Sequence, residues 1–141
     1  MRTFKYWMFV PTALVILLAS SSLVRSETIA IRPRLQQADP LVFSGTSGGS
    51  QNSNDCGMIA TTPNHVIQID EQIDYLRFTV EGGGQPTLLI EGPNSRTCVP
   101  GLPGEHKVED SGLWKPGRYS ISIGEAAGGQ HSYKLSITRQ R

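Results

Sequence analysis

The chain has 141 residues, of which 38% are hydrophobic and 18% charged, and its formal net charge is +1 at pH 7. The thirteen basic and twelve acidic residues are scattered along the sequence. Nucleic-acid binding needs a clustered basic face, so nucleic acid is not expected as a partner.

The first 26 residues have the three parts of a secretory signal peptide. Arg2 and Lys5 are basic, Met8–Ala19 is mostly apolar, and Val24 and Ser26 occupy the −3 and −1 positions of a cleavage site. The apolar run is shorter than the roughly 20 residues that span a bilayer. We therefore predict cleavage after Ser26, no membrane span in the mature chain, and a secreted or periplasmic location. An uncleaved anchor is the alternative.

The mature chain has ten basic and twelve acidic residues and is long enough for one domain but not for two. It contains two cysteines, Cys56 and Cys98. An even number of cysteines in an exported chain predicts a disulfide, and two cysteines allow only one pairing. Closing this loop stabilises the fold by about 4 kcal/mol in the chain-entropy model. A redox or metal pair is less favoured, because the Cys-x-x-Cys spacing is absent.

The segment 27–55 is predicted to be an extension and linker ahead of a folded domain at 56–139. Ile29–Ile31 and Leu41–Phe43 are short apolar patches, compatible with either an edge strand or a mobile segment. Ser44–Asp55 is rich in Gly, Ser and Asn and has no large apolar residue. Such a composition is typical of a flexible linker.

From Cys56 onward, short apolar runs alternate with turn residues, and no helical period is sustained. Tyr75–Val80 alternates, which places Leu76, Phe78 and Val80 inward. Thr87–Ile90 is continuously apolar and predicts a strand buried on both faces. The predicted strands also include Val66–Ile69, Arg96–Val99 and, weakly, Lys107–Glu109. This pattern predicts an all-β fold, an antiparallel β-sandwich of jelly-roll type.

The last part of the chain contains two strongly alternating runs. Tyr119–Ile123 alternates apolar residues with Ser120 and Ser122, and Tyr133–Ile137 does the same with Lys134 and Ser136. Pro116-Gly117 is a turn signal before the first run. The two runs, joined by Gly124–Ser132, predict a β-hairpin with a long loop.

The order of these strands, above all Pro-Gly-x-Tyr at 116–119 followed by Tyr-x-Leu-x-Ile at 133–137, resembles the bacterial pre-peptidase C-terminal domain over 70–138. It is also similar to short exported cyanobacterial proteins of this type. The resemblance implies a secreted, non-catalytic β-sandwich that serves secretion, localisation or substrate binding. Some members of the family bind calcium, but their acidic cluster has no counterpart near Gln85 and Pro86, and no protease domain is present.

No catalytic residue is predicted. Gly45–Gly49 matches Gly-x-Ser-x-Gly, but Ser47 lacks the strand and helix that a nucleophile elbow requires. His65, His106 and His131 are far apart in the sequence and belong to no recognisable triad. A serine hydrolase is therefore the less favoured alternative.

No metal site or cofactor is predicted. Asn52, Asn54 and Asp55 loosely resemble a calcium loop but lack its further carboxylates. Glu105, Glu109 and Asp110 are interpreted as a solvated acidic patch in a loop.

Three residues form the predicted binding surface: Tyr75, Arg77 and Trp114. Tyr75 and Arg77 fall on the outward side of their strand. Trp114 either packs across the end of the sandwich or offers a stacking surface to a ligand. The sequence thus predicts a secreted, non-catalytic module that binds an extracellular or envelope partner, protein or polysaccharide. An accessory domain acting with a separate protease, or a secreted hydrolase, is the alternative.

Overall fold

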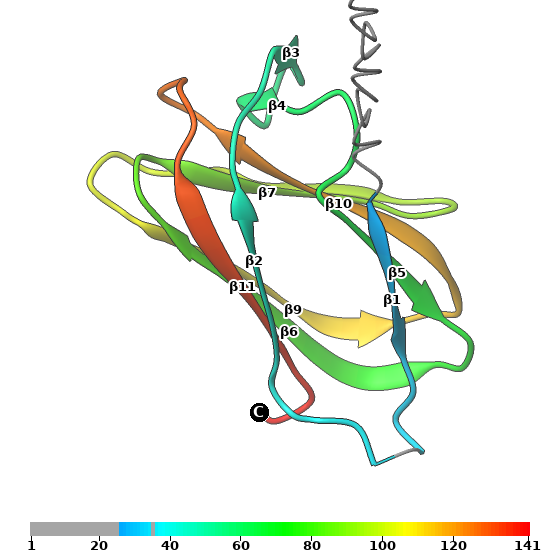
Figure 1. The fold of residues 1–141 in the computed structure, drawn as a ribbon. Helices are drawn as coiled ribbons and strands as arrows, with labels where there is room; N and C mark the ends of the chain where they lie inside the picture. The colour runs from blue at the N-terminus through cyan, green and yellow to red at the C-terminus, as the bar shows by residue number, and fades with distance from the viewer. Residues whose placement is uncertain (1–25, 35) are drawn as a thin grey trace, which may run out of the picture.

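The structure is a computed structural model that describes residues 26–34 and 36–141. The predicted signal peptide falls almost entirely on residues 1–25, outside this part. The described chain forms two sheets that face each other (Figure 1). Its strands are β1 Glu27–Ile31, β2 Leu41–Thr46, β3 Gln51–Asn52, β4 Met58–Ile59, β5 His65–Ile69, β6 Ile73–Gly82, β7 Pro86–Glu91, β8 Arg96–Val99, β9 Lys107–Trp114, β10 Gly117–Glu125 and β11 Ser132–Thr138.

The larger sheet is organised around β10, which pairs with β5 and β4 and also with β7. Strand β1 extends this sheet by pairing with β5 in parallel, and β8 extends it by pairing with β7. The smaller sheet has the order β2-β11-β6-β9 and is antiparallel throughout. The predicted all-β sandwich is confirmed. In the described residues, no helix has the length and apolar character needed to cross a membrane.

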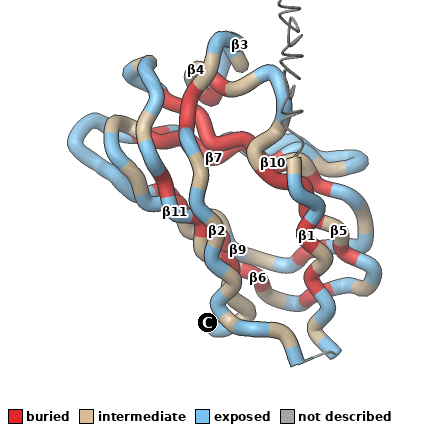
Figure 2. Tube along the Cα trace, in the orientation of Figure 1, coloured by how far each residue is buried: buried red, intermediate tan, exposed pale blue. Residues whose placement is uncertain are grey.

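The main core lies between the sheets, where the inward residues of both alternate with outward polar ones (Figure 2). Leu76, Phe78 and Val80 of β6 are fully buried, as predicted. In the larger sheet, Ile67, Ile121 and Ile123 face them. Burial of apolar surface of this extent is the main source of folding free energy in such domains.

A second, smaller cluster lies on the other face of β7. Leu88 and Ile90 point into the main core, whereas Leu89 packs with Cys56 and Ile59. The prediction that β7 is buried on both faces is therefore confirmed. The covering segment around Cys56 also buries Ser122, which the alternation had placed in water.

The predicted hairpin is wrong. Strand β10 belongs to the larger sheet and β11 to the smaller one, so the connection between them crosses from sheet to sheet. Alternation shows that each strand has one buried face. It does not show which strand is the neighbour, and the Gly-rich loop is long enough for either arrangement.

For 27–43 the edge-strand alternative is confirmed, whereas the assignment of 44–55 to a flexible linker is wrong. Strand β1 is an edge of the larger sheet, with Ile29 and Ile31 buried, and β2 is an edge of the smaller one. Residues 44–46 of β2 have the small and polar side chains of a linker. They still form a strand because their backbone pairs with β11. The sandwich begins at Glu27 and not at Cys56.

Candidate functional site

A cleft of about 460 Å³ opens where two strands at the sheet edges, β8 of the larger sheet and β9 of the smaller sheet, come together. Its walls are Ile90 and Thr97 on one side and the stretch Asp110–Lys115 on the other. The turn Pro93–Ser95 closes one end. Ligand sites in proteins are commonly concave, with apolar walls and a few polar groups. We call this feature the β8–β9 cleft.

The alternation of β9 explains the cleft. Asp110 is paired with Phe78 and Val108 with Val80, so Asp110 belongs to the inward row of the strand. The next inward position is Gly112, and a Cβ atom placed there would meet no other atom within 4 Å. The missing side chain therefore leaves an open space between Asp110 and Trp114.

The aromatic floor of the cleft is held rigidly. Trp114 stacks on Phe78 at a ring-centroid distance of 4.5 Å, and Tyr119 meets Trp114 edge-on at 4.6 Å. The Tyr119 hydroxyl donates a hydrogen bond to the Lys115 carbonyl at 2.8 Å. Trp114 is only 6% exposed, so it packs in the core and presents no more than a margin of its ring to the cleft.

Asp110 is a half-buried carboxylate at the inner wall of the cleft. Burial raises its pKa, and a hydrogen bond from the backbone of Ser111 acts in the opposite direction. Among the described residues, no basic side chain forms an ion pair with it. Titratable groups perturbed by burial in a cleft are typical of functional sites.

The three residues of the predicted binding surface are not brought together. Tyr75 and Arg77 lie on the outer face of the smaller sheet, whereas Trp114 faces inward. Arg77 Nε is 4.0 Å from Glu109 Oε2, and the Arg141 guanidinium lies over the Tyr75 ring at 5.2 Å. Both outer residues therefore already have partners within the chain.

Ser47 is buried in a polar cluster with Glu125 and His131. Its hydroxyl donates to Glu125 Oε1 at 2.6 Å and accepts from the His131 backbone N–H at 3.2 Å. Glu125 is fully buried and also accepts a hydrogen bond from the Gln85 backbone N–H at 2.8 Å. His131 Nδ1 lies 3.2 Å from the same carboxylate. Among the described hydrogen bonds, the imidazole makes none to the serine hydroxyl, and Ser47 is only 1% exposed.

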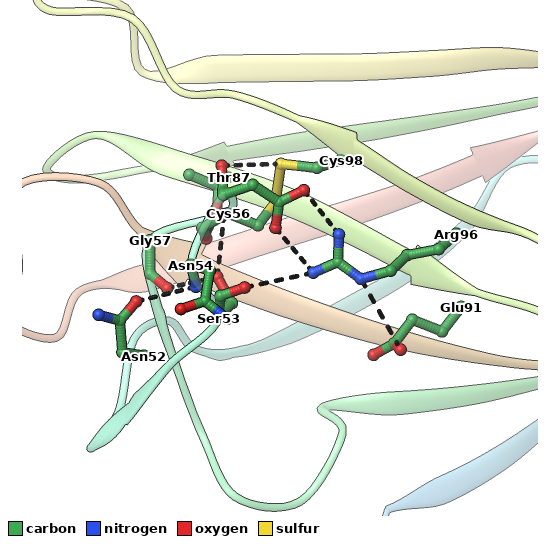
Figure 3. Close-up of a disulfide and its surroundings, with 10 residues drawn as sticks. Asn52, Ser53, Asn54, Cys56, Gly57, Thr87, Glu91, Arg96 and Cys98 are labelled. Carbon is green, nitrogen blue, oxygen red and sulfur yellow. Dashed lines mark hydrogen bonds and ion pairs between the residues drawn. A yellow bond between two sulfur atoms is a disulfide. The ribbon is translucent and has the colours of Figure 1, made fainter.

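The predicted disulfide between Cys56 and Cys98 is confirmed, with a Cα–Cα distance of 5.7 Å. The bond links β8, which carries Cys98, to the segment around Cys56 that covers β7 (Figure 3). Beside it, both guanidinium NH groups of Arg96 donate to Asp55, at 2.6 and 2.7 Å, and Thr87 Oγ1 donates to the Cys56 carbonyl at 2.6 Å.

The residues that loosely resemble a calcium loop have other roles here. Asn52 Oδ1 accepts the Asn54 backbone N–H at 2.9 Å, which is a local turn contact, and Asp55 is held by Arg96. In the part of the chain that the structure describes, no group of three or more His, Cys, Asp or Glu side chains could hold a metal ion.

An uncharacterized protein of Synechococcus elongatus is 41% identical over 109 residues, which cover 74% of this chain and 80% of that protein. The chain belongs to the family of this cyanobacterial protein. No model of a protein family matches the sequence.

The fold of this family member is that of a pre-peptidase C-terminal domain. The domain of that name from a Bacillus anthracis collagenase superposes with a TM-score of 0.53 at 14% identity, covering 81% of this chain and 95% of that domain. A periplasmic inhibitor of g-type lysozyme from Escherichia coli gives a TM-score of 0.43 at 11% identity, with 81% and 98% covered. The superposition on the collagenase domain confirms the expected resemblance in fold.

Sequence reasoning missed Asp110 and Gly112 as site residues. It interpreted Asp110, with Glu105 and Glu109, as a solvated acidic patch in a loop, whereas Glu109 and Asp110 lie in strand β9. The available signal was a period of two through Val108, Asp110, Gly112 and Trp114, which places the aspartate in an inward row. Two of these four residues are not apolar, so the strand was only weakly visible.

Proposed function

We propose that the protein is an exported, non-catalytic binding module, and that the β8–β9 cleft holds part of an extracellular or envelope partner. The observation that carries the proposal is the cleft itself, which combines an inward carboxylate, Asp110, with the margins of Trp114 and Tyr119. The cleft is formed by strands of a rigid sandwich and does not depend on a mobile loop. A preformed site of this kind limits the entropy lost on binding.

The polar groups in the interior support a binding role over a hydrolytic one. A hydrolase needs a nucleophile, a base and an orienting group that converge at an accessible place. In the described residues, the arrangement nearest to this is Ser47, Glu125 and His131, where the serine hydroxyl is directed at the carboxylate and closed off from solvent.

Two observations support an oxidising compartment outside the cytoplasm. Disulfides persist in secreted and periplasmic proteins and are rare in reducing compartments, and Cys56 is bonded to Cys98. The first 26 residues have the three parts expected of a signal peptide. The fold shared with a collagenase domain keeps an accessory role beside a separate protease as the second candidate.

Capture from envelope, medium and exopolysaccharide fractions tests the proposal. The bait is the chain without residues 1–25, which retains all eleven strands of the described part. Leu113→Lys puts a positive charge at the rim of the cleft, and the control Val42→Lys puts one on β2, at the opposite edge of the smaller sheet. Leu113 is 53% exposed and Val42 is 52% exposed, so neither substitution disturbs the core.

We expect a partner that binds again after purification, with affinity reduced about tenfold or more by Leu113→Lys and unchanged by Val42→Lys. Identification of the captured molecule separates protein from polysaccharide, and a protease among the partners would favour the accessory role. Equal binding by the wild type and Leu113→Lys, or no partner in any fraction, would refute the cleft as the binding site.

A further inference from the structure

We propose that the β8–β9 cleft receives the cationic side chain of a lysine or arginine from a protein partner, with Asp110 as the counter-charge. This inference rests on the proposed function and names the chemistry of its ligand. It follows from the position of Asp110 in the inward row of β9, beside the space left by Gly112, in a cleft whose lining also includes Trp114 and Tyr119.

The first argument is the lack of a partner for Asp110 within the chain. Four acidic residues of the described part are not exposed. Asp39 is bound by Arg139, Glu71 by Arg34, and Glu125 by Ser47. Asp110 alone has no side-chain partner in the described part. A half-buried carboxylate without a cationic neighbour is less favourable than a paired one, and an external cation would supply the missing counter-charge.

The second argument is the form of the aromatic floor. A lysine or arginine side chain can be held by the Asp110 carboxylate through a charge-assisted hydrogen bond and needs no open ring face. A sugar ring needs a broad exposed ring face. One face of Trp114 is covered by Phe78, and little of the ring is exposed. The cleft therefore fits a compact cation better than a neutral saccharide.

The third argument concerns the charges around the cleft. Lys115 is the basic residue in its lining, and it forms no ion pair with Asp110 among the described contacts. The neighbouring acidic residue, Glu109, belongs to the outward row and contacts Arg77 and Lys107 on the other face of the sheet. Lys115 therefore adds positive charge to the lining without pairing with Asp110, and Lys115→Ala should strengthen the binding of a cation.

The test uses short capped peptides, glycine–lysine–glycine and glycine–arginine–glycine, with norleucine and citrulline peptides as uncharged counterparts. Amide chemical shifts of the ¹⁵N-labelled chain without residues 1–25 report binding at Asn94–Thr97 and Asp110–Lys115. Asp110→Asn removes the charge with little change in shape. Glu109→Gln is the matched control, since it removes the adjacent carboxylate from the outward row.

We expect saturable shifts at the cleft with the cationic peptides, and binding at least about tenfold weaker for their uncharged counterparts and for Asp110→Asn. Glu109→Gln should bind as the wild type does. Equal binding of lysine and norleucine peptides, or no binding of either, would overturn the inference, and this comparison holds even if Asp110→Asn does not fold. If the lysine and norleucine peptides bind equally, or neither binds, while the captured partner still depends on Leu113, the proposed function stands. In that case only the cationic nature of the ligand is refuted.

Discussion

The Nε2 atom of His65 lies 2.7 Å from the hydroxyl oxygen of Tyr133, and this buried pair connects β5 of one sheet to β11 of the other. The rings meet edge-on, with centroids 5.9 Å apart. Burial lowers the pKa of His65, against an opposing effect of the Glu27 carboxylate. Burial also raises the pKa of Tyr133 to about 12, against a hydrogen bond with Asn64. Folding therefore favours the neutral form of both residues.

Stability should fall when the pH drops below about 6.5, the ordinary pKa of histidine. Because folded His65 has the lower pKa, the unfolded chain binds the proton first, and the loss continues until the pH reaches the folded pKa. This residue contributes at most about 1.4 kcal/mol per pH unit. Urea unfolding between about pH 8 and pH 5 measures the slope. The slope of the unfolding free energy against pH should become shallower in His65→Gln but not in His106→Gln, an exposed control. Equal slopes in the wild type and both variants would rule out His65 as the cause.

A corresponding loss is expected in alkali. The unfolded chain releases the tyrosine proton at about pH 10, whereas folded Tyr133 keeps it. Stability should therefore decline from about pH 10 upward. Tyr133→Phe should remove this contribution while destabilising the protein at neutral pH, because His65 then loses its partner. Denaturant unfolding of the two proteins at increasing pH makes the comparison, and a parallel decline in both would rule out Tyr133 as the cause.

Ser47→Ala should lower the free energy of unfolding by about 1–3 kcal/mol, because the fully buried Glu125 carboxylate loses a hydroxyl donor. Ser50→Ala, an exposed serine of the same segment, should change stability little. The same variants separate structure from catalysis. No turnover of peptidase, esterase or glycosidase substrates is expected from the wild type, and turnover abolished by Ser47→Ala would show that the buried cluster is an active site.

The parts of the fold that the sequence predicted are those where local patterns decide the structure. The alternation in β6 and the apolar run of β7 identify strands because burial selects those residues directly. The partner of β10 could not be predicted in this way. Its alternation is compatible with any neighbour, and the choice of β5 and β7 depends on contacts between residues far apart in the sequence.

The candidate site was less visible for the same reason. The sequence identifies Trp114 as a candidate site residue because it is aromatic. Its place in the floor of the β8–β9 cleft depends on Phe78 and Tyr119, which come from different sheets. Asp110 matters because of its burial, which only the assembled sandwich creates. The disulfide is the exception, since two cysteines in an exported chain leave one pairing, and the pairing is the one observed.

Loss of the disulfide through Cys98→Ser should lower stability by about 2–5 kcal/mol. The bond holds the segment that covers Leu89, so hydrogen exchange should increase first at Gln51–Ile59 and only later in the main core. Thermal unfolding with and without a reductant, together with amide exchange, measures both effects. Titration of the unfolded, unreduced protein should find no free thiol, and two thiols would contradict the pairing.

Deletion of residues 27–55 should abolish cooperative folding rather than release a stable domain at 56–141. The deletion removes β1 with the buried side chains of Ile29 and Ile31, leaves β11 without its neighbour β2, and takes Ser47 away from buried Glu125. Each of these losses exposes apolar surface or leaves a polar group without a partner, and a domain of this size has a small margin of stability. Removal of the exposed residues Gln140 and Arg141 is the control and should be tolerated. Circular dichroism and amide spectra of the two truncated chains decide the matter: a cooperative transition in the 56–141 chain would show that the sandwich stands without its first three strands.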